Sequence, residues 1–188
     1  MYERFGKRVL DALVAAALLL VLSPLMAFVA CAVRLEDRGP ALFCQTRSGR
    51  DLRPFTLLKF RSMPVSTPEI PSAAARAVRV TRIGRYIRRS NVDELPQLLN
   101  ILKGDMSIVG PRPALMSQEA LIAMRRVARV TRLRPGLTGL AQVNAYDDMP
   151  EHEKAAWDAR YSAAVSFRTD LAIVGRTFAY VLRAPPAY

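Results

Sequence analysis

The hydrophobic pattern begins with an apolar run over residues 13–33, which contains no charged side chain in 21 residues. That length is close to what an α-helix needs to cross a bilayer. Pro24 interrupts the run, because it has no N–H for the carbonyl of Leu20 and its ring collides with the preceding turn. The Ser23 hydroxyl is expected to bond the carbonyl of Leu19 and to ease the break. The pattern predicts an apolar helix broken at Ser23 and Pro24.

Three arrangements fit this segment: a cleaved signal peptide, a simple spanning helix, and a re-entrant hairpin that enters and leaves by the same leaflet. The run is longer than a signal-peptide core and has Ser-Pro in its middle, which argues against cleavage. Arg4, Lys7 and Arg8 precede it and a basic region follows it. Since positive charge favours the cytoplasmic side, both ends are expected there, and the hairpin is slightly favoured. Asp11, one turn before the apolar core, is expected at headgroup depth.

Beyond this run, the periodicities predict a small β-hairpin followed mainly by helices. The hairpin has arms at residues 42–46 and 55–60. Residues 64–75, with three prolines, are predicted to form an irregular loop, and residues 132–143 a loop with a short strand. Helices are predicted at residues 76–89, 96–103, 114–128, 151–165 and 167–183. The predicted fold class is therefore α+β and mainly α.

Two of the predicted helices are amphipathic. Over residues 76–89, apolar side chains share one face while arginines recur at every third position. Over residues 167–183, Leu171, Val174 and Phe178 share a face from which the arginines are absent. Core packing explains such a stripe, and so does a helix that lies in the membrane interface. The sequence leaves both interpretations open.

Charge points to anionic partners. The chain has 28 Lys and Arg against 16 Asp and Glu, for a formal net charge of +12. Such an excess suits phosphates, nucleic acid or acidic lipid headgroups. The two cysteines have no metal-ligand spacing, and one histidine cannot build a zinc site alone. A reducing environment without a disulfide framework is expected.

The candidate chemistry lies in two adjacent carboxylates, Asp93 and Glu94, which directly follow the arginine-rich helix. Pro96 suits the first turn of a helix and Gly104 suits its end, so the acids are expected at a helix N-terminus. There the helix dipole and free N–H groups stabilise negative charge. An ordinary N-cap would account for the pair if it stood alone.

Basic residues around the pair favour a reactive site over a simple cap. Arg88 and Arg112 flank it in the sequence, and Lys59 ends the predicted hairpin. Such cations are expected to lower the pKa values of both carboxyls and to keep them ionised. An ionised carboxylate is a nucleophile toward phosphorus and a ligand for Mg²⁺, and arginines bind diphosphates. The segment therefore predicts acids that react or bind metal within a basic frame that holds phosphate.

Three motifs carry a family resemblance: "KFRSM", "TRIGRYIRRSNVDELPQLLNILKGDMSIVGPRP" and "RPGLTGLAQVN". They resemble the bacterial sugar transferase family, the monotopic phosphoglycosyl transferases. The likeness covers nearly the whole chain, which resembles the single-domain form of this family. The resemblance implies a re-entrant membrane helix at residues 1–35, broken at Ser23 and Pro24. It further implies a membrane-associated catalytic domain at residues 36–188, on the cytoplasmic face of the bacterial inner membrane.

The same resemblance implies an activity and roles for named residues. Family members transfer a phospho-sugar from a UDP-sugar to undecaprenyl phosphate and release UMP. It implies that Asp93 forms a covalent phospho-sugar intermediate and binds the required Mg²⁺, with Glu94 as proton acceptor or positioning group. Lys59, Arg88 and Arg112 are expected to bind phosphate. One departure leaves the sugar open, because Ala145 and Tyr146 replace a Gly-Arg pair common in the family.

Two alternative functions would also explain part of the sequence. A membrane-tethered nucleic-acid binder would explain the basic helix, and a non-catalytic scaffold on anionic lipid would explain the basic surface. Neither explains the adjacent acids or the "GPRP" segment at residues 110–113. We therefore expect no nucleic-acid partner. The sequence does not determine the oligomeric state.

Overall fold

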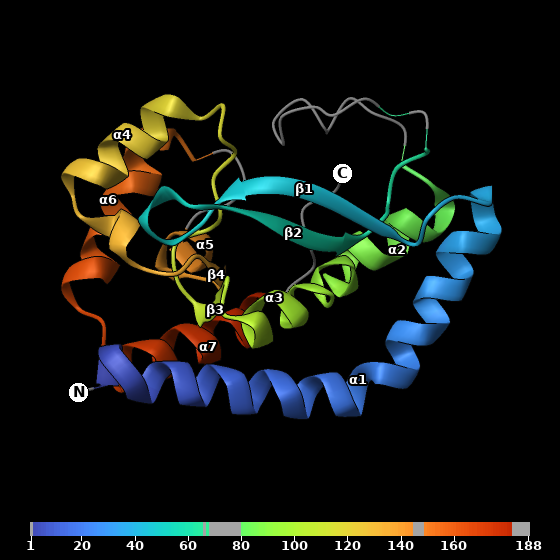
Figure 1. Ribbon diagram of the computed structural model, residues 1–188, viewed down its shortest axis with the longest axis horizontal. Helices are drawn as coiled ribbons and strands as arrows, with labels where there is room; N and C mark the ends of the chain where they lie inside the picture. Colours follow the sequence, from blue (N-terminus) through green and yellow to red (C-terminus); the bar gives the residue numbers. More distant parts are fainter. Residues whose placement is uncertain (1, 66, 68–79, 145–148, 182–188) are drawn as a thin grey trace.

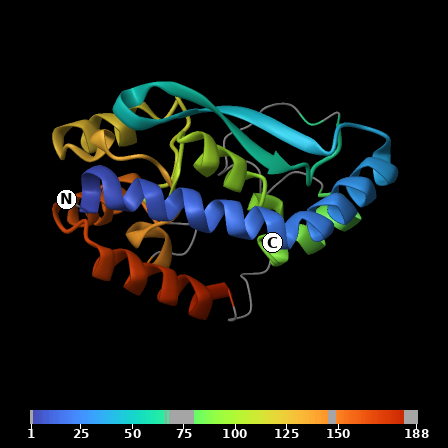
Figure 2. The same ribbon diagram turned by 60° about the horizontal axis from the view of Figure 1, so that its bottom comes forward.

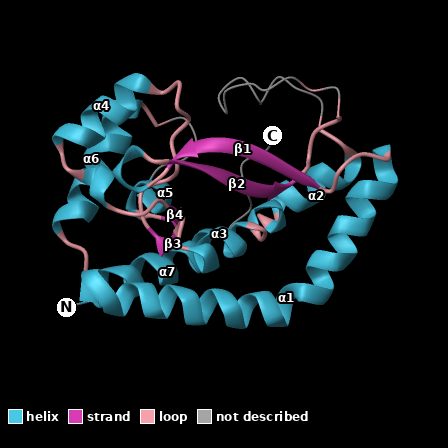
Figure 3. Ribbon diagram, viewed as in Figure 1, coloured by secondary structure: helices cyan, strands magenta, loops and turns pink. Residues whose placement is uncertain are grey.

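Helices dominate the fold, as the periodicities predict, and an antiparallel hairpin lies across one side of them (Figure 1, Figure 3). The structure is a computed structural model and describes residues 2–65, 67, 80–144 and 149–181. Its helices are α1 (Lys7–Asp37), α2 (Arg82–Arg89), α3 (Gln97–Lys103), α4 (Glu119–Val127), α5 (Leu140–Asn144), α6 (Glu151–Ala163) and α7 (Phe167–Val181). Its strands are β1 (Leu42–Ser48), β2 (Pro54–Phe60), β3 (Ser107–Val109) and β4 (Gly136–Thr138).

The helix α1 contains the whole apolar run and extends beyond it at both ends. It is long and apolar enough to cross a membrane, and most of its apolar side chains are exposed. Two arms of this helix meet at a bend (Figure 1, Figure 2). Pro24 lies inside the helix, and the Ser23 Oγ donates to the carbonyl of Leu20 at 2.9 Å. The hydroxyl thus bonds the carbonyl that Pro24 leaves without a donor, and not that of Leu19 as expected.

Each arm of α1 packs against a different apolar cluster. The first arm contributes Ala15 to a cluster with buried residues of β2 and α3. The second arm contributes Val29 and Val33 to a cluster with Phe60 of β2 and Ile87 of α2. Burial of these side chains stabilises the contact of both arms with the rest of the protein. The bend therefore lets one helix line two clusters.

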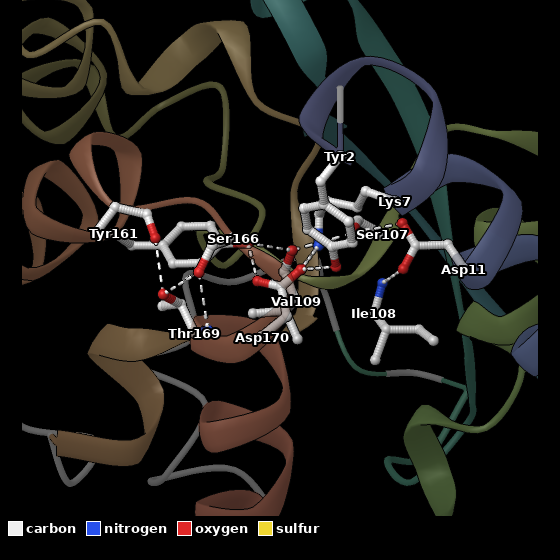
Figure 4. A network of polar contacts seen from close by, with 11 residues as sticks. Tyr2, Lys7, Asp11, Ser107, Ile108, Val109, Tyr161, Ser166, Thr169 and Asp170 are labelled. Atoms are coloured by element: carbon white, nitrogen blue, oxygen red, sulfur yellow. Dashed lines mark hydrogen bonds and ion pairs between the residues drawn. The ribbon is translucent and has the colours of Figure 1, made fainter.

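A buried polar network ties the start of α1 to α7 (Figure 4). The Asp170 carboxylate accepts hydrogen bonds from Tyr2 at 2.6 Å, from Lys7 at 2.5 Å and from Tyr161 at 2.7 Å. Burial, together with this carboxylate, raises the pKa of Tyr2 and of Tyr161. Both phenols therefore stay protonated and keep donating, and the network fixes the N-terminal arm against the last helix.

Asp11 is buried inside the protein, a contact that the sequence did not predict, and its expected position at headgroup depth stays a prediction. Its carboxylate accepts a hydrogen bond from the Ser107 hydroxyl at 2.7 Å and from the Ile108 N–H at 3.1 Å (Figure 4). The two donors belong to β3, almost a hundred positions further along the chain. A buried carboxyl group is tolerated here because these donors replace water.

The predicted hairpin is confirmed, and both strands are longer than expected by one or two residues. Leu42 pairs with Phe60 at one end and Ser48 pairs with Pro54 at the other. The strand β4 within residues 132–143 is also confirmed, and it pairs in parallel with β3. The helix α5 in the same stretch was not expected, because the two glycines and the proline before it indicate a loop.

Two helices begin later than the periodicity predicts. The helix α2 begins at Arg82 because the Thr81 hydroxyl caps it, accepting from the Gly84 N–H at 2.9 Å. The helix α4 begins at Glu119, since the residues before it run beside β1 and the Ala114 carbonyl accepts from the backbone of that strand. Most of the predicted loop at 64–75 and residues 76–79 lie outside the described residues.

The helices α6 and α7 confirm the last two predicted helices. Phe167 of α7 packs edge-on against Tyr2, so α7 lies beside the start of α1 (Figure 2). Ile173 of α7 is buried, whereas Leu171 and Phe178 are 59% and 68% exposed. Core packing therefore does not account for the whole apolar stripe of this helix.

Candidate active site

Asp93 and Glu94 lie in the 3-10 turn Val92–Glu94, immediately before α3. Asn91 enters this turn in the left-handed conformation, at φ 54°, which asparagine adopts more readily than most residues. Helix α3 starts directly after Pro96 and ends at Gly104, whose φ is 97°. The predicted helix is thus confirmed, with the acids in a separate turn in front of it.

Two apolar side chains beside the acids anchor this turn. Val92 packs against the cluster of the second α1 arm, and Leu95 packs against the clusters of both arms. The acids therefore lie next to the place where the two arms of α1 meet the rest of the protein. The break in α1 and the acidic turn, distant in sequence, belong to one packed unit.

Asn100 fixes α3 to the edge of strand β2, beside the acids. Its Oδ1 accepts from the Leu58 N–H at 3.1 Å, and its Nδ2 donates to the Thr56 carbonyl at 2.7 Å. The side chain is 1% exposed, and the two bonds satisfy strand groups that would otherwise lack partners. Since Lys59 follows Leu58 in the strand, Asn100 also sets the position of that lysine.

Glu94 is held by two of the predicted cations. Its Oε1 accepts from Lys59 Nζ at 2.6 Å and from Arg112 Nη2 at 3.0 Å. Burial would raise the pKa of Glu94, but Lys59 and Arg112 outweigh it and hold the pKa at about 2. Glu94 is therefore an ionised carboxylate that fixes both basic side chains.

Asp93 has a different environment from its neighbour. It is 8% exposed, and among the described residues no group donates a hydrogen bond to its carboxylate. Burial raises the pKa of Asp93, and the Glu94 charge raises it further, against the opposite effects of Lys59, Arg88 and Arg112. This corrects the expectation that cations lower both pKa values, because burial dominates at Asp93.

The structure brings the five predicted site residues together. Arg88, at the end of α2, donates from Nε to the Ser62 hydroxyl at 2.8 Å. Lys59, Arg88 and Arg112 all lie close enough to Asp93 to affect its pKa. Two acids and three cations therefore share one site, in which three different elements and the GPRP segment take part.

Sequence reasoning missed a buried ion pair behind Arg112. The guanidinium of Arg125 binds Asp158 Oδ2 through Nε at 2.9 Å and through Nη2 at 2.6 Å. Its Nη1 donates to the carbonyl of Arg112 at 2.9 Å. No signal in the sequence links Arg125 to a residue 33 positions away, whereas Asn100, a polar residue within "LLNIL", could have been noticed.

The acids of the site are candidate ligands for a divalent metal. No group of three His, Cys, Asp or Glu side chains lies together in the described part of the chain. Mg²⁺ does not need such a cage, because it binds through one or two carboxylates together with substrate phosphates and water. The Asp93 carboxylate suits this mode, since no donor in the described part of the chain engages it. The substituted pair Ala145 and Tyr146 lies outside the described residues.

Comparisons with known proteins give matches over nearly the whole chain. The family model described as "Bacterial sugar transferase" matches residues 2–184. A UDP-glucose:undecaprenyl-phosphate glucose-1-phosphate transferase of Caulobacter vibrioides is 43% identical, over 97% of this chain and 72% of that protein. An undecaprenyl-phosphate glucose phosphotransferase of Komagataeibacter xylinus is 40% identical, over 92% of this chain and 35% of that protein.

A third relative has a different sugar in its name. The undecaprenyl-phosphate galactose phosphotransferase of Salmonella typhimurium is 37% identical, over 99% of this chain and 42% of that protein. This chain therefore spans less than half of two of the three relatives. The match over nearly the full chain, with identities well above 30%, decides the family. The chain belongs to the bacterial sugar transferase family and is a phosphosugar-transferring enzyme.

Proposed function

We propose that this protein transfers a phospho-sugar from a UDP-sugar to undecaprenyl phosphate and releases UMP. The names of the relatives support both substrates. The observation that carries the proposal is the buried Asp93 carboxylate, which has no donor among the described residues and lies among three cations. The product, a polyprenyl-diphosphate sugar, is the first membrane-bound intermediate of a glycoconjugate.

Asp93 is the proposed nucleophile. One of its carboxylate oxygens attacks the β-phosphorus of the UDP-sugar, and the bond from that phosphorus to the bridging oxygen breaks. UMP leaves with the electron pair, and the phospho-sugar stays on Asp93. A phosphate oxygen of undecaprenyl phosphate then attacks the same phosphorus, which releases the carboxylate. Burial supports this role, because a partly desolvated carboxylate is a stronger nucleophile than a hydrated one.

The cations make the approach of two anions possible. Asp93 and an anionic substrate repel each other, and Lys59, Arg88 and Arg112 offset this charge. A phosphoryl group in transfer carries negative charge on its outer oxygens, which such donors stabilise. The guanidinium groups of Arg88 and Arg112 can each form bidentate hydrogen bonds with a phosphate, whereas the Lys59 ammonium acts as a point charge.

Glu94 acts as a positioning group in this proposal. A carboxylate whose pKa is about 2 is a poor proton acceptor at neutral pH. Its Oε1 holds Lys59 and Arg112 at hydrogen-bond distance, so it keeps both cations near Asp93. The attacking phosphate of the lipid is already ionised and needs no base. Of the two roles that the resemblance implies, the geometry supports positioning.

Mg²⁺ is the proposed cofactor, with Asp93 as its protein ligand. When bound, it would neutralise charge on the donor diphosphate and on the leaving UMP. Removal of divalent ions with a chelator is expected to abolish UMP release, and added Mg²⁺ to restore it.

We also propose that α1 is re-entrant, with both ends at the cytoplasmic face of the inner membrane. The bend, the exposed apolar side chains of both arms, and the bond from Ser23 to Leu20 support this topology. Cys31 and Cys44 are exposed and would first be replaced by serine. Single cysteines placed before and after α1 should then react with an impermeant thiol reagent from the same side. Labelling from opposite sides would contradict the re-entrant topology.

The activity itself is tested by UMP release from a panel of UDP-sugars with undecaprenyl phosphate in detergent or vesicles. With donor alone, intact mass should show a phospho-sugar adduct on the protein. Asp93→Asn should abolish both the adduct and turnover. The matched control is Asp51→Asn, which changes an exposed acid in the hairpin turn. Full activity of Asp93→Asn would exclude this residue as the nucleophile.

A further inference from the structure

The face of the hairpin that carries Lys59 also carries a second cation, Arg47. In the antiparallel register, Phe43 lies opposite Lys59 and Arg47 lies opposite Phe55. Side chains alternate between the faces of a strand, so residues 43, 45 and 47 share the face of their partners on β2. Lys59 contacts Glu94 from this face. Arg47 is therefore on the active-site side of the hairpin, four positions along β1 from the residue opposite Lys59.

Neutral oxygens hold Arg47 in place. Its Nε and Nη2 donate to Gln45 Oε1 at 3.0 Å and 2.6 Å, and its Nη1 donates to the Pro113 carbonyl at 3.3 Å. A guanidinium has five N–H donors, so these contacts with described residues leave one donor on Nη1 and one on Nη2. The side chain is pre-oriented, and two donors remain for a ligand.

The charge around Arg47 favours an anion. Burial and the neighbouring Arg112 lower the pKa of Arg47 to about 10, while Glu94 acts in the opposite direction. Arg47 thus stays charged at neutral pH, although it lies near a second guanidinium. Glu94 Oε1 accepts from Lys59 and Arg112, and Arg47 has neutral acceptors only among the described residues. A bound phosphate would relieve the repulsion between the two arginines.

We propose that Arg47, oriented by Gln45, binds a phosphate of the nucleotide that leaves as UMP. This inference rests on the proposed function and adds a donor-binding residue to it. Phosphate is present in both the nucleotide donor and the lipid acceptor, so position decides between them. The end of β1 lies on the opposite side of the molecule from the bend of α1 (Figure 1). A lipid phosphate approaches from the apolar α1 side, whereas a soluble nucleotide can reach the hairpin end directly.

The test compares Arg47→Gln with the wild type in the full chain, using UDP-glucose, undecaprenyl phosphate and UMP as probes. The KM for UDP-glucose and the inhibition constant of UMP should both rise about 10- to 100-fold, as expected for lost charged hydrogen bonds. The KM for undecaprenyl phosphate should stay within about twofold. Arg47→Lys should be intermediate, because lysine keeps the charge but not the planar fork.

Arg50→Gln is the control, since Arg50 is an exposed cation in the same hairpin turn. It should leave all three constants unchanged. If Arg47→Gln does not fold, as judged by thermal unfolding, Arg47→Lys carries the test. A rise in the KM for undecaprenyl phosphate alone, or no change in any constant, would overturn the inference. If the wild type releases no UMP from any donor, the proposed function fails instead, and the assignment of Arg47 fails with it.

Discussion

Asp158→Ala should destabilise the protein strongly, although Asp158 lies outside the acidic turn. Asp158 of α6 is 1% exposed and Arg125 of α4 is 7% exposed, so the pair between them is shielded from water. Two charged hydrogen bonds, at 2.9 Å and 2.6 Å, join them. Truncation leaves a buried guanidinium with the Arg112 carbonyl as its remaining partner among the described residues. The loss should be about 3–5 kcal/mol, because an uncompensated buried charge is costly.

The assay is thermal unfolding of the protein in detergent, monitored by tryptophan fluorescence. Trp157, the single tryptophan of the chain, precedes Asp158 on α6 and reports on this helix. For a chain of this size the loss corresponds to a fall in melting temperature of roughly 6–20 °C. Arg126→Ala, which removes the exposed neighbour of Arg125, should change stability by less than about 0.5 kcal/mol. Equal effects of Asp158→Ala and Arg126→Ala would refute the reasoning.

A double variant separates stability from activity. Arg125→Met with Asp158→Leu replaces the pair by apolar side chains of similar size, which should recover most of the stability. It still removes the donor that holds the Arg112 carbonyl. We therefore expect a well-folded protein whose KM for the donor is raised about tenfold, the effect of misplacing one phosphate-binding group. Normal kinetics of this variant would show that Arg125 stabilises the fold without positioning Arg112.

Three further predictions concern other groups. Glu94 has a folded pKa of about 2 against an ordinary 4.5, so its stabilisation is present above the ordinary value and is lost as pH falls toward 2. In Glu94→Gln, the loss of unfolding free energy on acidification should therefore be smaller by about 3 kcal/mol than in the wild type. An equal loss in both proteins would contradict the assigned pKa. Asp11→Ala should cost about 1–3 kcal/mol in thermal unfolding, since the Ile108 N–H loses its acceptor and the Ser107 hydroxyl keeps only the Val109 carbonyl. Gly104→Ala should cost about 1 kcal/mol in the same assay, because φ there is 97°, and a neutral result would argue against this cap.

Much of the local structure follows from residues that are neighbours in sequence. The apolar run predicts α1, and Pro24 predicts its break, because helix formation depends on contacts within four residues. The hairpin and the helix after Pro96 are likewise predicted from residues that are close together in the sequence. The adjacent acids and the surrounding cations were predicted as a site from sequence, and the structure places them together. Their roles, the Mg²⁺ requirement and the re-entrant topology stay predictions.

The sequence by itself determined the element types, the break in α1 and the candidate acids, since each depends on side chains a few positions apart. Tertiary structure alone decided which charges are buried and which partners they meet. It placed Asp11 against β3, and it raised the pKa of Asp93 while Glu94 stayed ionised. It also placed Arg47 near Arg112 and Glu94. Desolvation and charge pairing act through space, so residues from separate parts of the chain settle them.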